Sequence, residues 1–161
     1  FVAEKINVDL GFYPHYYGPY SGQVASELQT LCAINVVEEH YQSFISQSEL
    51  PFKKYSYHLT PDGNKLLEYL DQECPNEERE TVQTVIDICR DVAQLNSEII
   101  SWAAKVHMIL HRTDKPMTPE EIIATSRQFH WKMTDEDKIA TAINLLDELK
   151  LIQVIREVPN V

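Results

Sequence analysis

Residues 17–37 have the sequence YGPYSGQVASELQTLCAINVV, and this stretch decides the fold. Val24, Leu28 and Leu31 recur at steps of four and three residues, which predicts an amphipathic helix with one apolar face. The β-branched residues that follow predict a strand within residues 34–41. A short helix followed at once by a strand is the first indication of a mixed α and β fold.

The next segment completes a helix, hairpin and helix. Apolar and polar side chains alternate over residues 55–59, the pattern of a half-buried strand, and the polar residues 42–52 are predicted to form the loop of a hairpin. Thr60 is a suitable N-cap and Pro61 suits the first helical position. This order of elements is compatible with a winged helix.

Aromatic residues are concentrated just before residues 17–37 and at the start of that stretch. Residues 12–21 combine five aromatic rings with Pro and Gly, which predicts a structured turn. The chain opens with Phe1 rather than Met, inside a stretch predicted to be structured. We therefore expect that a leading segment is missing and that the part before Gly11 is incomplete.

Two motifs carry a resemblance to a known family. YGPYS at residues 17–21 is followed by an apolar helix, and YHLT at residues 57–60 is followed by Gly63. Over residues 12–63 the chain resembles the YwgA-like winged-helix proteins of bacteria and archaea. The resemblance implies a winged-helix fold and a loose association with transcriptional regulators, but no catalytic or binding residues. Asn35 departs from the pattern, because a glycine often precedes the strand there.

The second half is predicted to be mainly helical. Residues 77–112 contain no Gly or Pro, and their apolar residues recur at three- and four-residue steps, so they form one long helix or two nearly continuous helices. Thr118 and Glu121 form a capping box. Helices are predicted from there to about residue 128 and from about residue 135 to Lys150, followed by a strand over residues 151–157. Ile139, Ile143, Leu146 and Leu149 line the core face of the second of these helices.

The predicted fold class is therefore mainly α with a small β-hairpin, an α+β fold. We expect a winged-helix unit over residues 1–74, a long connecting helix over residues 75–112, and a second helix-turn-helix or winged-helix-like unit over residues 113–161.

Composition limits the function. The 161 residues carry a formal net charge of −11, and acidic residues outnumber basic ones in every third of the chain, which weakens a general case for nucleic-acid binding. No apolar run is long enough to span a membrane, so we expect a cytoplasmic protein. Three cysteines without a CxxC pair argue against a disulfide framework or a zinc cluster.

Candidate contacts to DNA are few. The helix over residues 21–33 offers Gln23 but no Lys or Arg. Lys53 and Lys54 lie where a wing would contact phosphate, although they could equally protect an edge strand from pairing. In the second half the candidate contacts are Arg127, His130, Lys132 and Lys138. The acids at residues 135–137 oppose them, but these acids also suit the start of a helix.

The aromatic stretch is the other candidate surface. Tyr16, Tyr17 and Tyr20 are predicted to stack on bases or to bind a partner peptide, unless they form the core of their own small module. His107 and His111 lie four residues apart, but a third ligand is missing, so no metal site is expected.

Recognised catalytic and cofactor motifs are missing from the sequence, so neither an enzyme nor a cofactor is expected. We expect a winged-helix protein of the regulator type that binds DNA or a protein partner, as a homodimer or within a complex. The alternative is an acidic protein-interaction adaptor without DNA binding. A pocket that gathers several ionisable side chains would instead favour an enzyme.

Overall fold

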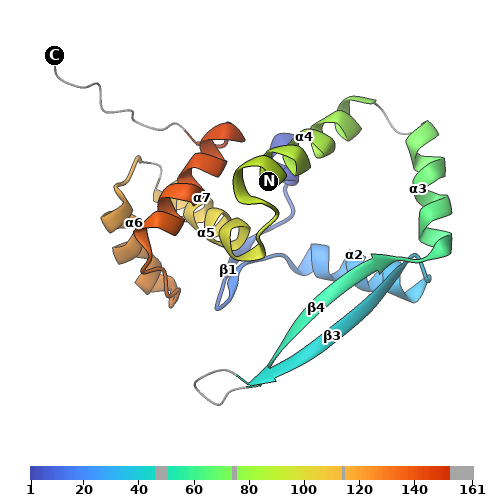
Figure 1. Cartoon of the computed structure of the whole chain (residues 1–161), viewed down its shortest axis with the longest axis horizontal. Helices are drawn as coiled ribbons and strands as arrows, with labels where there is room; N and C mark the ends of the chain where they lie inside the picture. The colour runs from blue at the N-terminus through green and yellow to red at the C-terminus, as the bar shows by residue number, and fades with distance from the viewer. Residues whose placement is uncertain (46–50, 74–75, 114, 153–161) are drawn as a thin grey trace. The chain divides into compact units, whose positions relative to one another are not determined.

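The computed structural model describes residues 1–45, 51–73, 76–113 and 115–152. The chain is mainly helical and contains two small antiparallel sheets of two strands each, which confirms the predicted α+β class (Figure 1). Among the described residues, no helix is both long and apolar enough to cross a membrane.

The chain forms two compact units. One consists of Phe1–Ser21 together with Asn76–Val161, and the other of Gly22–Pro75. The first 21 residues therefore cluster with the C-terminal part of the chain, whereas we had grouped them with the predicted winged-helix unit. Each unit is described separately below.

The unit of Gly22–Pro75 contains a long hairpin between two helices. Its elements in order are α2 (Gly22–Ala33), β3 (Val37–Ile45), β4 (Pro51–Leu59) and α3 (Pro61–Glu73). The strands pair from Val37 opposite Leu59 to Ile45 opposite Pro51. The predicted loop over residues 42–52 was too wide, because β3 continues into it as far as Ile45 and β4 already begins at Pro51. Residues 46–50 lie outside the described part.

Thr60 connects the hairpin to α3. Its backbone N–H donates to the carbonyl oxygen of Val36, and its hydroxyl donates to that of Asn35 at 2.6 Å. The same hydroxyl accepts the N–H of Gly63 at 3.0 Å, so Thr60 caps the helix as predicted. Asn35 has φ 59°, a left-handed conformation that Asn tolerates better than most residues.

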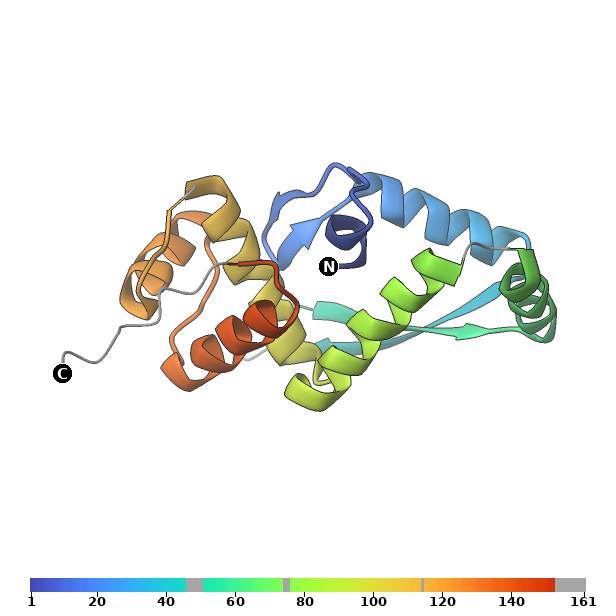
Figure 2. The same ribbon diagram turned by 90° about the horizontal axis from the view of Figure 1, so that it is seen from above.

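The other unit is a helical bundle with a small hairpin (Figure 2). Its N-terminal part consists of α1 (Val2–Lys5), β1 (Tyr13–His15) and β2 (Gly18–Tyr20). Its C-terminal part consists of α4 (Asn76–Ala93), α5 (Ser97–Thr113), α6 (Pro119–Ser126), a 3-10 turn over Arg127–Phe129 and α7 (Glu136–Glu148). The predicted turn over residues 12–21 is thus a hairpin.

The buried core lies in this unit, mainly where α5 packs against α7. Ala103, Val106 and Ile109 of α5 are fully buried. The other core residues are Val85, Cys89, Ala93, Trp102, Ile122, Trp131, Met133, Ile139, Ala142, Leu145, Leu146 and Leu149. The predicted apolar face of the last helix is confirmed, since Ile139, Leu146 and Leu149 belong to this core.

The predicted long connecting helix is two helices, the second of the alternatives left open. Gln94 and Leu95 both have left-handed φ angles, 51° and 53°, which ends α4. The side-chain oxygen of Asn96 then accepts the backbone N–H groups of Glu98 at 2.9 Å and Ile99 at 3.3 Å, which starts α5. Both helices pack on α7. They are therefore part of the bundle.

Local signals at the later helix ends were predicted correctly. The capping box of Thr118 and Glu121 is present, and the Asp135 carboxylate accepts the N–H of Lys138 at the start of α7. Lys150 has φ 53° and follows the last helix. Of the predicted strand over residues 151–157, Leu151 and Ile152 are not in a strand, and the remaining residues lie outside the described part.

We predict that Gly63→Ala destabilises the protein by about 2 to 3 kcal/mol, because of overpacking. A Cβ atom on Gly63 would lie 2.1 Å from the carbonyl oxygen of Val36, a backbone atom that cannot move freely. Urea unfolding followed by circular dichroism measures the effect. Gly22→Ala is the matched control, because a Cβ atom on Gly22 would meet nothing within 4 Å. Equal stability of the two variants would contradict the prediction.

Candidate functional site

The β1–β2 hairpin presents tyrosines at its tip. Tyr13, Pro14 and His15 pair with Tyr20, Pro19 and Gly18, which leaves Tyr16 and Tyr17 as a two-residue turn. Tyr16 and Tyr17 are 59% and 68% exposed. The alternative that these rings form the core of their own module therefore does not hold at the tip, where they are open to a partner.

Ring contacts and a close approach shape this hairpin. The rings of Tyr16 and Tyr17 meet edge to face at 5.0 Å between centroids, and those of Tyr13 and Tyr20 at 5.6 Å. Gly18 has φ 137°, and a Cβ atom there would lie 3.2 Å from Cε of Lys105 on α5. The close approach of α5 and the backbone conformation both favour glycine at this position.

Trp131 anchors the hairpin to the bundle. Its ring is only 2% exposed, and Nε1 donates to the carbonyl oxygen of His15 at 2.7 Å. The loop that carries Trp131 is also fixed by its backbone. The N–H of Trp131 donates to the carbonyl oxygen of Ser126, and the preceding residue, His130, has a left-handed φ of 58°. The tyrosine tip and the loop after α6 are thus held beside each other.

An open hollow of about 530 Å³ lies between the tip and the loop. We call it the hairpin–loop hollow, and the described residues that line it are Tyr16, Arg127, His130, Trp131, Lys132, Met133 and Thr134. Met133 is 1% exposed and contributes apolar surface together with Trp131, while Arg127, His130 and Lys132 are exposed. Four residues predicted as contacts from separate parts of the sequence therefore share one site.

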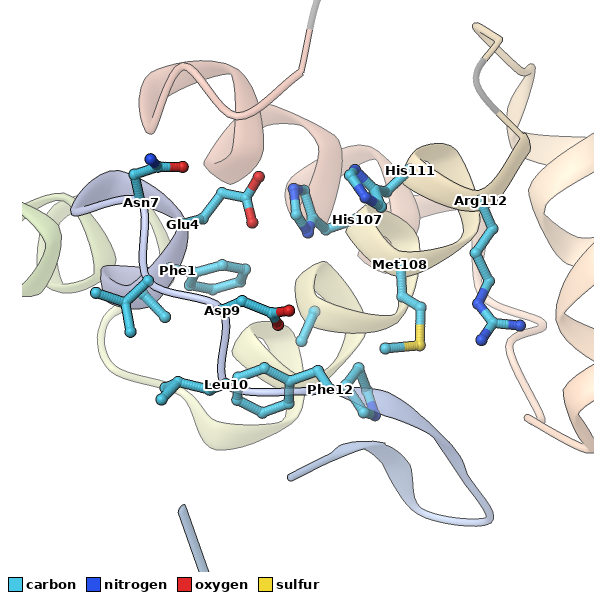
Figure 3. Close-up of a pocket in the computed structure, with 14 residues that line it drawn as sticks. Phe1, Glu4, Asn7, Asp9, Leu10, Phe12, His107, Met108, His111 and Arg112 are labelled. Carbon is cyan, nitrogen blue, oxygen red and sulfur yellow. The ribbon is translucent and has the colours of Figure 1, made fainter. Parts of the chain in front are cut away.

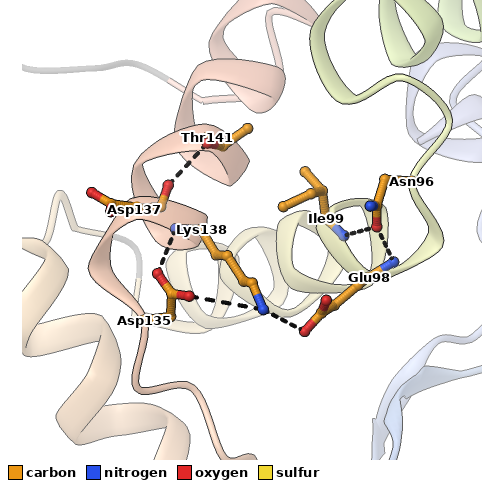
Figure 4. Close-up of polar contacts among 7 residues, drawn as sticks. All are labelled: Asn96, Glu98, Ile99, Asp135, Asp137, Lys138 and Thr141. Atoms are coloured by element: carbon orange, nitrogen blue, oxygen red, sulfur yellow. Dashed lines mark hydrogen bonds and ion pairs between the residues drawn. The ribbon is translucent and has the colours of Figure 1, made fainter.

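Lys138 lies on α7 but is engaged within the protein (Figure 4). Its Nζ atom lies 2.7 Å from a carboxylate oxygen of Glu98 and 3.8 Å from one of Asp135. The hydrogen bond to Glu98 is the main reason that the pKa of Lys138 is raised. Its charge is thus largely balanced by acids of the same unit. Tyr20, also predicted, is 41% exposed and packs near His15.

The remaining predicted contacts belong to the unit of Gly22–Pro75. Gln23 is exposed in the first turn of α2. Lys53 and Lys54 are exposed on β4, and Nζ of Lys53 lies 4.1 Å from the centroid of the Tyr41 ring. That contact gives Lys53 a structural role in the hairpin, as a cation over an aromatic face.

A second cavity of about 410 Å³ lies in the helical unit, between α1, the segment before the β1–β2 hairpin and α5. Figure 3 shows its side chains. The ionisable residues that line it are Glu4, Asp9, His107, His111 and Arg112. Within the described residues, no hydrogen bond links either carboxylate to either imidazole. The cavity therefore gathers several ionisable side chains, the feature that would favour an enzyme, although within the described residues it holds no hydrogen-bonded carboxylate–imidazole pair of the kind that activates a nucleophile.

The two histidines of α5 stack with ring centroids 6.1 Å apart. Burial lowers the pKa of His107, and the nearby Glu4 carboxylate opposes that shift. In the described part of the chain, no three residues among His, Cys, Asp and Glu are placed to hold a metal ion.

Comparison of this chain with protein-family models, with curated proteins and with solved structures gives no match in any of the three. The case for a function therefore rests on the residues themselves.

Trp131 is the functional residue that the sequence analysis missed. It was assigned to a turn between two helices, whereas its indole connects that turn to the hairpin. A tryptophan inside a short interhelical segment was the available signal, because a buried indole N–H needs an acceptor.

We predict that Trp131→Phe lowers the free energy of unfolding by about 1 to 2 kcal/mol, since the carbonyl of His15 loses its donor. Hydrogen exchange of the β1–β2 amides measures whether the hairpin is released. Trp102→Phe is the control, because the indole of Trp102 makes no hydrogen bond to the described residues. Unchanged exchange in Trp131→Phe would show that the bond does not hold the hairpin.

We predict that the protein loses stability on acidification below about pH 6.5, the ordinary pKa of histidine. His107 has a lowered pKa in the folded state, so the unfolded state binds protons first as the pH falls. The contribution of neutral His107 to the free energy of unfolding is therefore present in full above about pH 6.5 and declines as the pH falls below it. Urea unfolding between pH 7.5 and about 5 should show a smaller pH dependence in His107→Gln. An identical dependence in both proteins would contradict the prediction.

Proposed function

We propose that this protein is a non-enzymatic winged-helix module that acts as an interaction adaptor and binds a protein partner through the hairpin–loop hollow. In this proposal, α2 is the helix and β3–β4 the wing of one winged-helix element, and α5, α6 and α7 form a helix-turn-helix. The supporting observation is the exposed tyrosine tip held over an apolar, cation-lined hollow by the Trp131–His15 hydrogen bond.

Charge favours a protein partner over duplex DNA. Asp and Glu outnumber Lys and Arg by 17 to 11 in the helical unit and by 8 to 3 in the unit of Gly22–Pro75. A surface that binds duplex DNA without sequence preference needs basic residues to neutralise phosphates, and neither unit has an excess of them.

The helices that would enter a DNA groove are also poorly suited. Helix α2 has no Lys or Arg and carries an exposed Glu27. Helix α7 begins with Glu136 and Asp137, both exposed, and its Lys138 is paired with acids. Phosphate groups approaching the start of either helix would meet no free cation of that helix within the described residues.

The tip has the properties of an interface anchor. Tyrosine presents a large amphipathic surface and loses little conformational entropy on binding. Tyr16 and Tyr17 extend from a turn whose hairpin is fixed to the bundle, so the rings are already positioned before a partner arrives. Such anchors often supply most of the binding energy of a protein interface.

We predict that a photo-crosslinking amino acid at position 16 gives discrete protein adducts in a lysate of the source organism, and that the same amino acid at position 69 gives far fewer. Tyr16 and Tyr69 are equally exposed, at 59%, so exposure alone cannot explain a difference. Adding Arg127→Glu should remove the adducts at position 16, because it reverses a charge in the hollow.

Fluorescence anisotropy with duplex DNA at about 0.15 M salt completes this test. The adaptor proposal expects no saturable binding by the whole chain. Saturable binding that weakens in Lys53→Gln or Lys132→Gln, together with equal crosslinking at positions 16 and 69, would replace the adaptor with a DNA-binding regulator.

A further inference from the structure

We propose that the hairpin–loop hollow recognises an acidic peptide segment of the partner that also carries an aromatic or other apolar side chain. This inference rests on the proposed adaptor function and specifies the chemistry of its ligand. Carboxylates of the segment face Arg127 and Lys132, and its apolar side chain lies against Tyr16 and Trp131.

The charge of the hairpin–loop hollow differs in sign from that of the whole chain. The whole chain has a net charge of −11, yet the described residues that line this hollow include Arg127, His130 and Lys132 and no Asp or Glu. Asp135 lies just beyond the lining, but its carboxylate already accepts the N–H of Lys138 at 3.1 Å and lies 3.8 Å from Nζ of that residue.

The charged groups of Arg127 and Lys132 are exposed and available to a ligand. Within the described residues, neither Arg127 nor Lys132 forms an ion pair, which is also true of other exposed cations such as Lys54 and Lys115. An arginine guanidinium can hold a carboxylate through two parallel hydrogen bonds, and an exposed lysine adds a further positive charge. The hollow is thus complementary to an anionic group.

Part of the lining of the hollow is apolar. Tyr16 is 59% exposed and supplies apolar ring surface that a ligand can cover, whereas Trp131 and Met133 are almost fully buried. Inorganic anions would gain nothing from such a surface, whereas a side chain with a ring or a branched apolar end would bury area there. The volume of about 530 Å³ is sufficient for side chains but is open, as expected for part of a larger interface.

The small extent of the positive charge suits a peptide better than a nucleic acid. A single-stranded nucleic acid also combines anions with rings, and it binds to grooves whose positive charge follows the backbone over several nucleotides. Here the cationic lining is confined to one hollow in a unit with 17 acids and 11 bases. A short acidic segment needs only the local charge and not an extended groove.

The experiment measures fluorescence anisotropy of the whole chain with three labelled probes: a peptide that alternates Glu and Tyr, the same peptide with Gln for Glu, and a single-stranded oligothymidine. We expect saturable binding of the Glu–Tyr peptide, and binding at least about tenfold weaker for the Gln peptide and the oligonucleotide. Arg127→Gln and Tyr16→Ala should each weaken the Glu–Tyr peptide about tenfold. Arg127→Lys should lie between, because it keeps the charge but not the paired hydrogen bonds.

Lys115→Gln is the matched control, since it removes an exposed positive charge of the same unit outside the hollow. An equal loss in this control, or equal affinity for the Glu and Gln peptides, would overturn the inference. Preferential binding of the oligonucleotide would overturn it in favour of nucleic acid. If position 16 still crosslinks a partner but the Glu–Tyr peptide does not bind, the adaptor function stands and the acidic ligand is wrong.

Discussion

The hydrogen bond from Trp131 Nε1 to the carbonyl oxygen of His15 is the interaction on which the candidate site depends. It joins residues 116 positions apart and fixes a hairpin whose strands have only three residues each. Isolated two-stranded hairpins are marginal in water, so such a short one needs support from the rest of the unit. Together with the packing of β2 on α5, this bond positions Tyr16 relative to Arg127 and Lys132.

The features that could be predicted from the sequence are those set by local interactions. Thr60 and Thr118 were identified as helix caps because a capping side chain bonds to a backbone group only three residues away. The apolar face of α7 was identified because its period matches the helix. The break after Ala93 was left open as one of two alternatives, because it is made by two consecutive left-handed residues, neither of them Gly. Asn96, which caps α5, was a local signal available there.

The site itself could be predicted only in part, for a physical reason. Tyr16, Arg127, His130 and Lys132 were each proposed as contact residues, but their meeting in one hollow depends on how the hairpin packs on the bundle. Packing of this kind is decided by tertiary contacts such as the indole bond of Trp131, which has no sequence period. Lys138 was also expected to contact a partner, because its ion-pair partner Glu98 lies 40 residues earlier in the chain and the pairing has no sequence signal.

Helix ends account for several of the charges in the helical unit. Asp135 caps α7, and Glu136 and Asp137 lie where the helix dipole favours negative charge, so the acidic start of that helix has a structural reason whatever the partner is. Arg127 also has a local reason, because it is the C-cap of α6 and lies in the last turn of the 3-10 segment, where the helix dipole favours a positive charge, whereas Lys132 forms no ion pair within the described residues. What distinguishes Arg127 and Lys132 from other unpaired cations is that they share one hollow with the exposed Tyr16 and that the described lining of this hollow includes no Asp or Glu. The hollow, more than either candidate groove-binding helix, is therefore where a partner is expected to bind.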